Sequence, residues 1–413
     1  MTRTPDHVTG GLALLALVLR AGWVAYRWTC HGAAFEYPDE ELHWQLATHL
    51  VRDGSFVTED GRLAARMPLY PLFLAPCAAL GSVGVLLARL AQAVVGAATV
   101  IVAHRLARAA AGPRAALIGG LLVACDPFGI FFGNLLLTET LFTFLGVALT
   151  ACAWDVMTRS PGNWRAWSGV AAIGAAAILT RPSAAGWLPL LWLLILALGR
   201  DRRRIGPRLV ACPVVLALLL LPWGLRNQAV LRDYAWLSTN GGVTLFDAQG
   251  PQADGSSNQA FLWEMAELHG LGEVERDRLL KQLAVQQMRS DPGRVLRLAG
   301  VKFLRTWSPL PNVTEYRTGP AAIAGAAYTL LLLAGTVAAV IRAWSDRRHA
   351  SAADRRRLLA LVALPLLYFT LVHCVYIGSV RYRVPLMPLM ALVTAVEIGR
   401  LRFDAAGGGL SSA

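Results

Sequence analysis

Charged residues are scarce in this sequence, and acidic residues are scarcer than basic ones. Only 16% of the residues are charged, with 26 Asp and Glu against 39 Lys and Arg, whereas 55% are hydrophobic. The mean hydropathy of +0.48 excludes an ordinary soluble composition. Long apolar runs with so little charge predict a polytopic α-helical membrane protein, because a helix satisfies its own backbone polar groups within lipid.

Cysteine motifs, internal repeats and low-complexity segments are also missing, apart from a Gly/Ser-rich C-terminal tail. The six cysteines are scattered and form no CxxC or Cys/His spacing, so we infer neither structural zinc nor a disulfide framework. The first apolar segment has no small-residue cleavage site. It is therefore interpreted as a retained helix.

The apolar runs predict about ten membrane-spanning helices joined by two extended outer loops that bear interfacial helices. We place the spans near residues 11–28, 84–106, 115–133, 138–157, 166–181, 183–199, 209–225, 319–341, 358–378 and 384–400. The predicted organisation has three parts. Residues 1–226 form an N-terminal transmembrane module with an acidic outer loop at 29–81. Residues 227–318 form an outer helix-and-turn domain, and residues 319–413 form the last helices and tail.

The outer domain contains three predicted helices: Gln259–His269, Val274–Ser290 and Arg294–Trp307. The third is basic and amphipathic, which is typical of a helix that lies on the membrane surface.

The net charge of +13 is explained by membrane topology rather than by nucleic acid. Basic runs occupy alternate loops, at Arg105–Arg114, Arg159–Arg165, Arg200–Arg208 and Arg342–Arg357, with a further run at Arg400–Arg402. The positive-inside rule then predicts that these loops and both termini face the cytoplasm. We therefore expect a multi-pass protein of the inner (plasma) membrane with its polar loops on the outer face.

Acidic residues gather in one stretch, Phe35–Asp53, directly after the first apolar run. Pro38 suits the first turn of a helix, where its missing N–H costs nothing. Asp39, Glu40 and Glu41 follow in that turn, where the helix dipole favours negative charge. A capped amphipathic helix and a catalytic acid are both consistent with this pattern.

Two further outer segments carry charge next to apolar runs. Arg66 can extend toward lipid headgroups, or it can bind phosphate, because guanidinium donors match phosphate oxygens in pairs. Thr138 and Glu139 are typical of a helix cap. A carboxylate at the depth of Glu139 is also costly enough to need a partner or a purpose.

Arginines recur on the outer side, where the positive-inside rule disfavours them. Arg181 closes a predicted helix, and Arg381 and Arg383 flank Tyr382 between the last two helices. Interfacial anchoring explains each one singly, but their number on this side favours a functional cluster.

Taken in order, these segments resemble the GT-C glycosyltransferases, specifically the bacterial family-39-like branch that includes the aminoarabinose transferase of lipid A and the protein O-mannosyltransferases. The segments are Pro38-Asp39-Glu40, Arg66-Met67-Pro68-Leu69, Thr138-Glu139, Thr180-Arg181-Pro182, Pro-Trp-Gly-Leu-Arg-Asn at 222–227, Ser238-Thr239-Asn240-Gly241-Gly242 and Arg381-Tyr382-Arg383-Val384-Pro385. Pro38 stands where the branch often has Gly, and Met67 stands where it often has Pro. The outer domain is smaller than that of the protein O-mannosyltransferases, so the resemblance does not settle which acceptor is used.

The resemblance implies inverting transfer of a sugar from a polyprenyl-phosphate donor to an acceptor hydroxyl on the outer face. The acceptor can be a glycan, a lipid or a protein, and membrane lipids are further partners. Among the matching residues, Asp39 is the expected base, with Glu40 as a helper. A divalent cation held by these two carboxylates is an open alternative. The remaining roles are donor-phosphate binding by Arg66, Arg381 and Arg383, and acceptor binding or support by Glu139, Arg181, Tyr382 and His43.

Three other functions remain to be weighed. A transporter or flippase of lipid-linked glycans predicts charges deep within helices and repeat symmetry between halves, whereas here the charges cluster at outer helix ends. A polysaccharide polymerase or ligase shares the lipid-linked substrates and an outer-loop site. A non-catalytic scaffold does not require acids and arginines to converge on one face.

Overall fold

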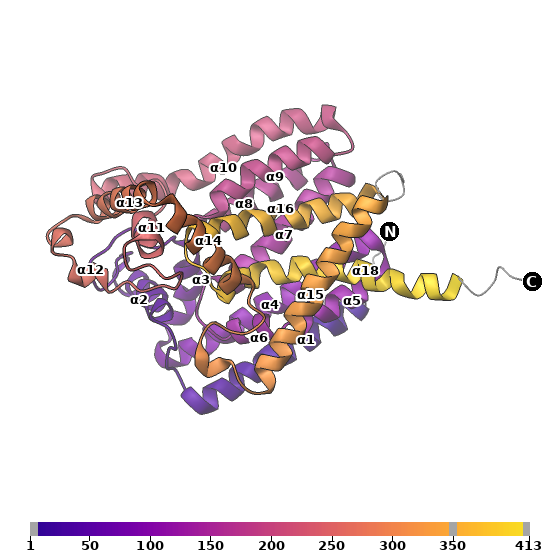
Figure 1. The fold of residues 1–413 in the computed structure, drawn as a ribbon, viewed down its shortest axis with the longest axis horizontal. Helices are drawn as coiled ribbons and strands as arrows, with labels where there is room; N and C mark the ends of the chain where they lie inside the picture. Colours follow the sequence, from indigo (N-terminus) through magenta and orange to yellow (C-terminus); the bar gives the residue numbers. More distant parts are fainter. Residues whose placement is uncertain (1–6, 347–352, 408–413) are drawn as a thin grey trace, which may run out of the picture.

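The structure, a computed structural model, describes residues 7–346 and 353–407, with side chains of the last helix as far as Arg400. Part of the basic run Arg342–Arg357 and most of the Gly/Ser-rich tail lie outside these ranges. Within them every regular element is a helix (Figure 1). The predicted all-α class is confirmed for this part of the chain.

Seven helical stretches in the described ranges are long and apolar enough to cross a membrane. They are α1 (His7–His31), α4 (Gly81–Ala111), α7 (Glu139–Thr158), α10 (Arg202–Leu231), α15 (Pro320–Ser345), α16 (Ala353–Val375) and the stretch Val380–Arg400, which runs through α17 (Val380–Arg383), η5 (Val384–Leu386) and most of α18 (Met387–Gly407). Each coincides with a predicted span. The chain is a polytopic membrane protein.

The other three predicted spans correspond to shorter helices: α5 (Pro113–Ala124), α8 (Trp164–Thr180) and α9 (Ala184–Leu198). The prediction of one continuous helix over 115–133 is wrong, because α5 ends at Ala124 and α6 (Pro127–Phe132) follows separately. Pro127 disfavours helical backbone at the residue before it. Asp126 instead caps α6 by accepting the Phe128 N–H at 3.0 Å.

Two helices form the centre of the bundle. In an 18-residue apolar stretch of α7, 72% of the residues are buried. The same share is 83% for Val380–Arg400 and only 17% for α10, which lies at the periphery. The α18 helix packs against α5 and α15, and α7 packs against α4 and α8. A Cβ on Gly335 would lie 2.4 Å from the Thr394 side chain, so α15 and α18 can approach this closely only with glycine there.

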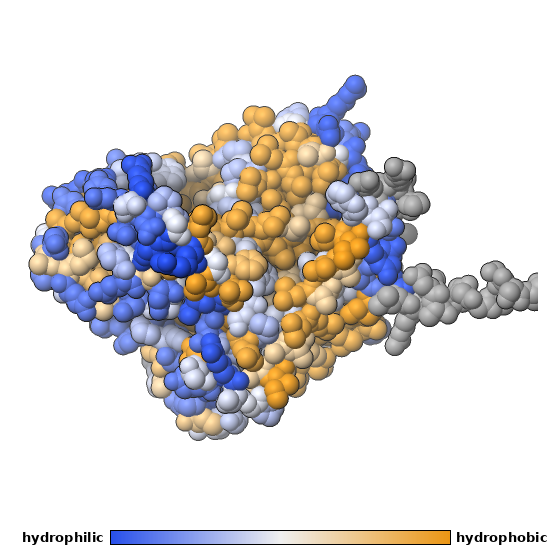
Figure 2. Space-filling model, in the orientation of Figure 1, coloured by the Kyte–Doolittle hydropathy of each residue, from blue (hydrophilic) through white to orange (hydrophobic). Residues whose placement is uncertain are grey.

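Several helices that are not among the seven long apolar stretches gather at one end of the bundle, called here the α2 end. They include α2 (Pro38–Asp53), α3 (Leu69–Ala78), α11 (Gly241–Gln249), α13 (Glu273–Ser290) and α14 (Pro292–Trp307), and the 3₁₀ turn η2 (Thr314–Tyr316) leads into α15. The α1 helix begins, and α18 ends, at the opposite end (Figure 1). Figure 2 shows a mainly hydrophobic surface over the long helices and a hydrophilic one over α11–α14.

Two of the three helices predicted in the outer loop are confirmed as α13 and α14. The predicted helix Gln259–His269 is wrong in extent, since it is reduced to α12 (Phe261–Glu264) and the 3₁₀ turn η1 (Ala266–Leu268). The backbone of Met265 is extended and separates the two. The α11 helix was not predicted, because its polar and glycine-rich start is typical of a turn.

Candidate active site

The start of α2 is held in place by the buried side chain of Glu40. Its Oε1 accepts the backbone N–H groups of Glu36 (2.9 Å) and Tyr37 (3.2 Å), and its Oε2 accepts that of Leu136 at 2.7 Å. Glu40 therefore fixes the first turn of α2 against the segment that precedes α7. The sequence predicts Glu40 as a catalytic helper; in the structure its carboxylate accepts three backbone N–H groups beside Asp39.

A continuous row of ion pairs, called here the ion-pair network, joins five of the predicted site residues. Asp39 Oδ1 accepts Arg66 Nη2 at 3.0 Å, and its Oδ2 accepts Arg381 Nη1 at 2.8 Å. Arg381 Nε also donates to Glu139 Oε1, which lies 2.6 Å from Arg181 Nη2. Residues spread over most of the sequence therefore converge at the α2 end.

The ion-pair network is open to solvent on one side and closed on the other. The side chain of Asp39 is 36% exposed, whereas that of Glu139 is fully buried. Burial raises the pKa of the Asp39 carboxyl, but the guanidiniums of Arg66 and Arg381 outweigh it and hold the pKa well below its usual range. A ligand would meet an ionised Asp39 first.

Arg181 connects the ion-pair network to the start of α7. It is the C-cap residue of α8, and its Nε donates to Thr138 Oγ1 at 2.7 Å. Its guanidinium also lies 5.2 Å from the ring centre of Phe142. Thr138 is the N-cap residue of α7 with Glu139 in the first turn, as predicted, but its hydroxyl makes no capping hydrogen bond and accepts Arg181 instead.

His43 lies one helical turn after Asp39 and is buried edge-on against Tyr70, with ring centres 5.0 Å apart. Burial, reinforced by Arg66, lowers the pKa of His43 to about 3, so its ring is neutral at pH 7. Its Nδ1 is buried without a hydrogen-bond partner in the structure. His43 thus supports the network through packing.

Tyr382 lies beside the network. Its ring stacks on His373, with centres 4.1 Å apart and planes tilted by 11°. The Arg381 guanidinium lies 6.0 Å from the centre of the Tyr382 ring. The stacked pair therefore packs next to the arginine that carries two of the ion pairs.

Arg383 does not join the ion-pair network. Its side chain is fully buried and donates to the carbonyl of Thr306 (3.2 Å) and the hydroxyl of Thr329 (3.1 Å). Its guanidinium stacks over the ring of Phe128 at 4.8 Å. The structure thus separates the two arginines that flank Tyr382, and Arg383 connects α14, α15 and α6.

The loop that carries Arg66 is held by residues far along the sequence. Glu273 at the start of α13 accepts the backbone N–H groups of Leu63 (2.7 Å) and Ala64 (3.0 Å). Arg226 donates to the carbonyl of Phe56 at 2.8 Å. Sequence reasoning missed Glu273, whose position in a predicted first turn is explained by the helix dipole alone.

The glycine-rich first turn of α11 packs closely against α13. The backbone N–H of Gly242 donates to Asp277 Oδ1 at 2.7 Å. A Cβ at residue 242 would lie 1.8 Å from the Asp277 carbonyl oxygen, so only glycine fits against α13 there.

Charged residues also lie inside the bundle, which corrects the expectation that charges cluster only at outer helix ends. Arg20 of α1 is buried and donates to the carbonyls of Ala124 (2.9 Å) and Val123 (3.2 Å), where α5 ends. Arg89 of α4 is buried and donates to Gly32 and Ala34, each at 2.8 Å. Both arginines donate to backbone carbonyls at or just after the end of a helix. In the sequence, an arginine within an apolar run was the sign that could have revealed these buried charges.

The carboxylates at the α2 end do not form a divalent-cation site. Asp39 and Glu139 each face two guanidiniums, and Glu40 accepts backbone N–H groups. Among the described residues no three His, Cys, Asp or Glu side chains converge. A cation bound by Asp39 and Glu40 would have to displace arginines and backbone donors, so this donor set does not fit a metal.

Residues 65–224 match the sequence profile of a family described as dolichyl-phosphate-mannose-protein mannosyltransferase. The matched segment contains Arg66, Glu139 and Arg181, and it leaves Asp39 and Arg381 outside. No curated protein matches the chain.

Solved structures of membrane transferases resemble this one. The oligosaccharyltransferase AglB from Archaeoglobus fulgidus, in complex with an inhibitory peptide and a dolichol-phosphate, is 13% identical and has a TM-score of 0.57; the match covers 98% of this chain and 52% of that one. ArnT from Cupriavidus metallidurans, bound to undecaprenyl phosphate, is 17% identical with a TM-score of 0.43, covering 97% and 78%. This chain spans about half the length of AglB, and the likeness to AglB shows a common fold.

Proposed function

We propose that this chain is a GT-C glycosyltransferase that transfers a sugar from a polyprenyl-phosphate donor to an acceptor hydroxyl with inversion. The match of residues 65–224 to the dolichyl-phosphate-mannose-protein mannosyltransferase family supports the proposal. The observation that carries the proposal is the ion-pair network. It combines a partly exposed carboxylate with two guanidiniums that an anionic donor can recruit.

Arg66 and Arg381 supply the phosphate site in this proposal. Both guanidiniums face the same carboxylate, at 3.0 Å and 2.8 Å. A phosphate presents oxygens of the same charge and geometry, so it can replace Asp39 as their acceptor. As the bond between the sugar and the phosphate breaks, negative charge grows on the phosphate, and these fixed cations stabilise it.

Asp39 is the proton acceptor. With both arginines bound to its oxygens, the carboxylate is a weak base, because its pKa lies below the usual range. Recruitment of the arginines by the donor phosphate raises that pKa and makes the carboxylate more basic. The acceptor oxygen then attacks the anomeric carbon, its proton passes to Asp39, and the polyprenyl phosphate leaves from the opposite face of the sugar.

The buried part of the network positions Arg381. Glu139 is fully buried between Arg381 and Arg181. A buried carboxylate with two cationic partners is costly to disturb, so it keeps the Arg381 guanidinium in one orientation while its exposed donors change partner. Glu40 holds the first turn of α2 through backbone hydrogen bonds, and His43 holds it by packing on Tyr70.

The site faces the outside of the cell membrane in this proposal, with both termini in the cytoplasm. The support is the distribution of arginine: the basic runs belong to loops at the opposite end of the bundle from α2. The donor's polyprenyl tail then lies along the apolar surface of the long helices.

Comparing cells with and without the chain tests the function. Mass spectrometry of envelope glycans, glycoproteins and lipid-linked sugars should detect loss of one sugar-modified product and accumulation of the sugar-loaded carrier. Arg66→Ala should reproduce the loss by weakening donor use about 100-fold, with partial rescue by Arg66→Lys, which keeps a point charge.

The control is Arg52→Ala, which removes an exposed arginine at the end of α2 that pairs with Asp53. It should leave the product unchanged. Identical glycans with and without the chain would refute transferase activity. A carrier that is unchanged in amount but redistributed across the membrane would identify a flippase.

A further inference from the structure

A hollow lined by arginines lies at the end of the bundle opposite the ion-pair network. Helices α15, α16 and α18 form its walls, and it contains about 370 Å³ of space that is partly open to solvent. Arg400 lies 19 residues beyond Arg381, which is roughly 29 Å along a helix axis. This hollow is therefore separate from the proposed transfer site.

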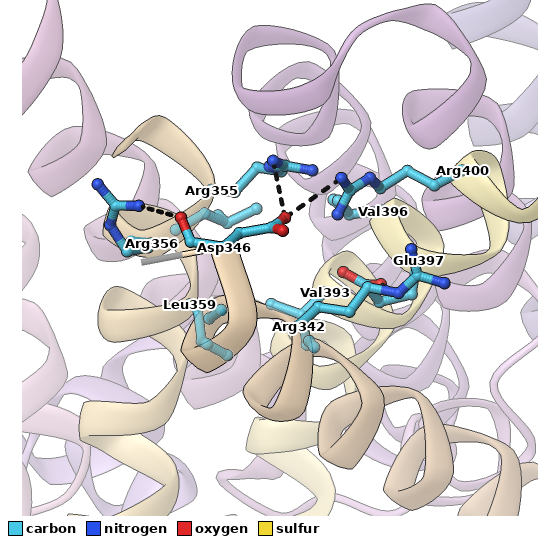
Figure 3. A pocket seen from close by; sticks show the side chains of 12 residues that line it. Arg342, Asp346, Arg355, Arg356, Leu359, Val393, Val396, Glu397 and Arg400 are labelled. Atoms are coloured by element: carbon cyan, nitrogen blue, oxygen red, sulfur yellow. Dashed lines mark hydrogen bonds and ion pairs between the residues drawn. The ribbon is translucent and has the colours of Figure 1, made fainter. Parts of the chain in front are cut away.

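The charges that line the hollow are mostly positive. Asp346 accepts Arg355 Nη2 at 3.2 Å and Arg400 Nη2 at 3.4 Å, and both guanidiniums point at its carboxylate (Figure 3). Glu397 pairs with Arg342 Nε at 3.0 Å. A fourth arginine, Arg356, donates to the backbone carbonyl of Asp346. Three guanidiniums pair with the two carboxylates and the fourth binds the backbone, so the lining carries four arginines against two acids, an excess of two positive charges.

The positive charge is accessible. The side chains of Arg342, Arg355 and Arg400 are 36%, 26% and 32% exposed, respectively. Arg355 and Arg400 each have five N–H donors, and both donate to the single carboxylate of Asp346. An anion that enters the hollow can therefore be bound without breaking the existing pairs.

The rest of the hollow and its surroundings are apolar. Ala339, Leu358, Val393 and Val396 are among the apolar residues that line it. The adjoining turns of α15 expose large apolar side chains: Val340 (50%), Ile341 (61%) and Trp344 (72%). An apolar helix face with tryptophan near its end is typical of the boundary between lipid tails and headgroups.

We propose that this hollow binds the phosphate headgroup of an anionic phospholipid, whose acyl chains lie along the exposed apolar face of α15. Basic pockets between transmembrane helices are suited to such headgroups, because their cations bind the phosphate while the tails remain in the bilayer. Free phosphate has the same oxyanion chemistry but makes no use of the apolar face. The bound lipid joins α15, α16 and α18 at this end.

The purified full-length protein, titrated in detergent with phosphatidylglycerol, phosphatidylcholine or inorganic phosphate, tests this proposal. Phosphatidylglycerol should raise the melting temperature and remain bound in native mass spectrometry, whereas the other two should not. Arg355→Gln/Arg356→Gln should weaken the apparent affinity for phosphatidylglycerol about tenfold. Arg202→Gln/Arg203→Gln removes two exposed arginines from the start of α10, and it is the matched control that should keep the wild-type response.

An unchanged response in the Arg355/Arg356 variant, or an equal loss in the control, would overturn the site. A comparable shift with inorganic phosphate would identify a free-phosphate site and overturn the lipid assignment. If the double variant fails to fold, Arg400→Gln provides the same comparison, because it removes the weaker of the two Asp346 contacts. Sugar transfer is not the readout, so failure here is distinguishable from failure of the proposed function.

Discussion

At the scale of single residues, Asp39 is balanced between two opposing effects. Partial burial disfavours its charge, and two guanidiniums within 3.0 Å favour it more strongly. The ion pairs keep the carboxylate ionised and aimed, yet they also keep it a poor base. The proposed mechanism resolves this conflict through the donor, whose phosphate draws the guanidiniums away when a proton acceptor is needed.

Asp39→Asn tests this role because it preserves shape while removing the charge and most of the proton affinity. A general base typically contributes about 10²–10⁴-fold, so sugar transfer should fall by that factor while the folded yield is retained. Both quantities are measured on the same purified protein, as transfer rate and melting temperature.

The control for that substitution is Glu41→Gln, which removes another acid from the same first turn at an exposed position. It should leave transfer unchanged. A purely structural acid at residue 39 predicts the opposite result for Asp39→Asn: a loss of about 0.3–1 kcal/mol of stability with turnover intact. That outcome would remove Asp39 from the mechanism.

At the scale of elements, the loop before α3 is ordered by α13. Glu273 binds the backbone of Leu63 and Ala64, and Arg226 binds that of Phe56. The Glu273 contacts cross the domain boundary predicted at residue 227, whereas Arg226 belongs to α10 and lies on the same side of that boundary as Phe56. We therefore propose that the segment 227–318 completes the donor site by holding Arg66, in addition to any contact with the acceptor.

Glu273→Gln should weaken this support, because an amide carries no charge and one of its two ends donates rather than accepts. Loss of hydrogen bonds at a partly buried site costs about 1–3 kcal/mol of folding free energy. The expected result is a lower melting temperature together with weaker use of the donor, measured as an increased KM for the sugar carrier.

Glu275→Gln is the matched control, since that carboxylate caps its own helix through Gly272 at 3.2 Å. It should lower stability slightly without changing the donor KM. An unchanged donor KM in Glu273→Gln would mean that the Arg66 loop is ordered without α13.

At the scale of the whole molecule, polarity and charge divide the bundle into two ends. Helices α11–α14 lie at the α2 end (Figure 1), where Asp39 of α2 carries the ion-pair network. The arginine-lined hollow (Figure 3) is formed where α15 ends and α16 begins, at the other end. Between them the surface is mainly hydrophobic (Figure 2). The proposed polyprenyl-phosphate donor is bound at the α2 end and the proposed anionic lipid at the hollow. In both cases the charged group contacts arginines and the apolar tail lies on the hydrophobic surface between the two ends.

Cysteine labelling tests the proposed orientation. In a background with the exposed Cys30 and Cys125 replaced by Ser, an impermeant maleimide should modify Ser256→Cys in intact cells. Ser345→Cys, at the end of α15 next to the hollow, should react only after the membrane is permeabilised. The reverse pattern would put the ion-pair network in the cytoplasm and contradict transfer at the outer face.

The sequence by itself determined the features that depend on nearby residues. The spans follow from the length and hydropathy of continuous runs, and α2 begins at Pro38 because its first turn carries the local signals of a helix start. The convergence of Asp39, Arg66, Glu139 and Arg381 was also predictable in outline. The predicted topology places all four residues at the same end of the bundle, so their proximity can be expected without knowing how the helices pack.

Only the tertiary structure decided which charges pair. Arg381 binds Asp39 across 342 positions of sequence, whereas Arg383, two residues later, turns into the protein and binds backbone carbonyls and Thr329. No local pattern separates these two arginines, because the direction of each side chain depends on how α17 packs. The same reason explains Glu273: its partners are backbone groups of a distant loop, and they exist as a binding site only after the helices have assembled.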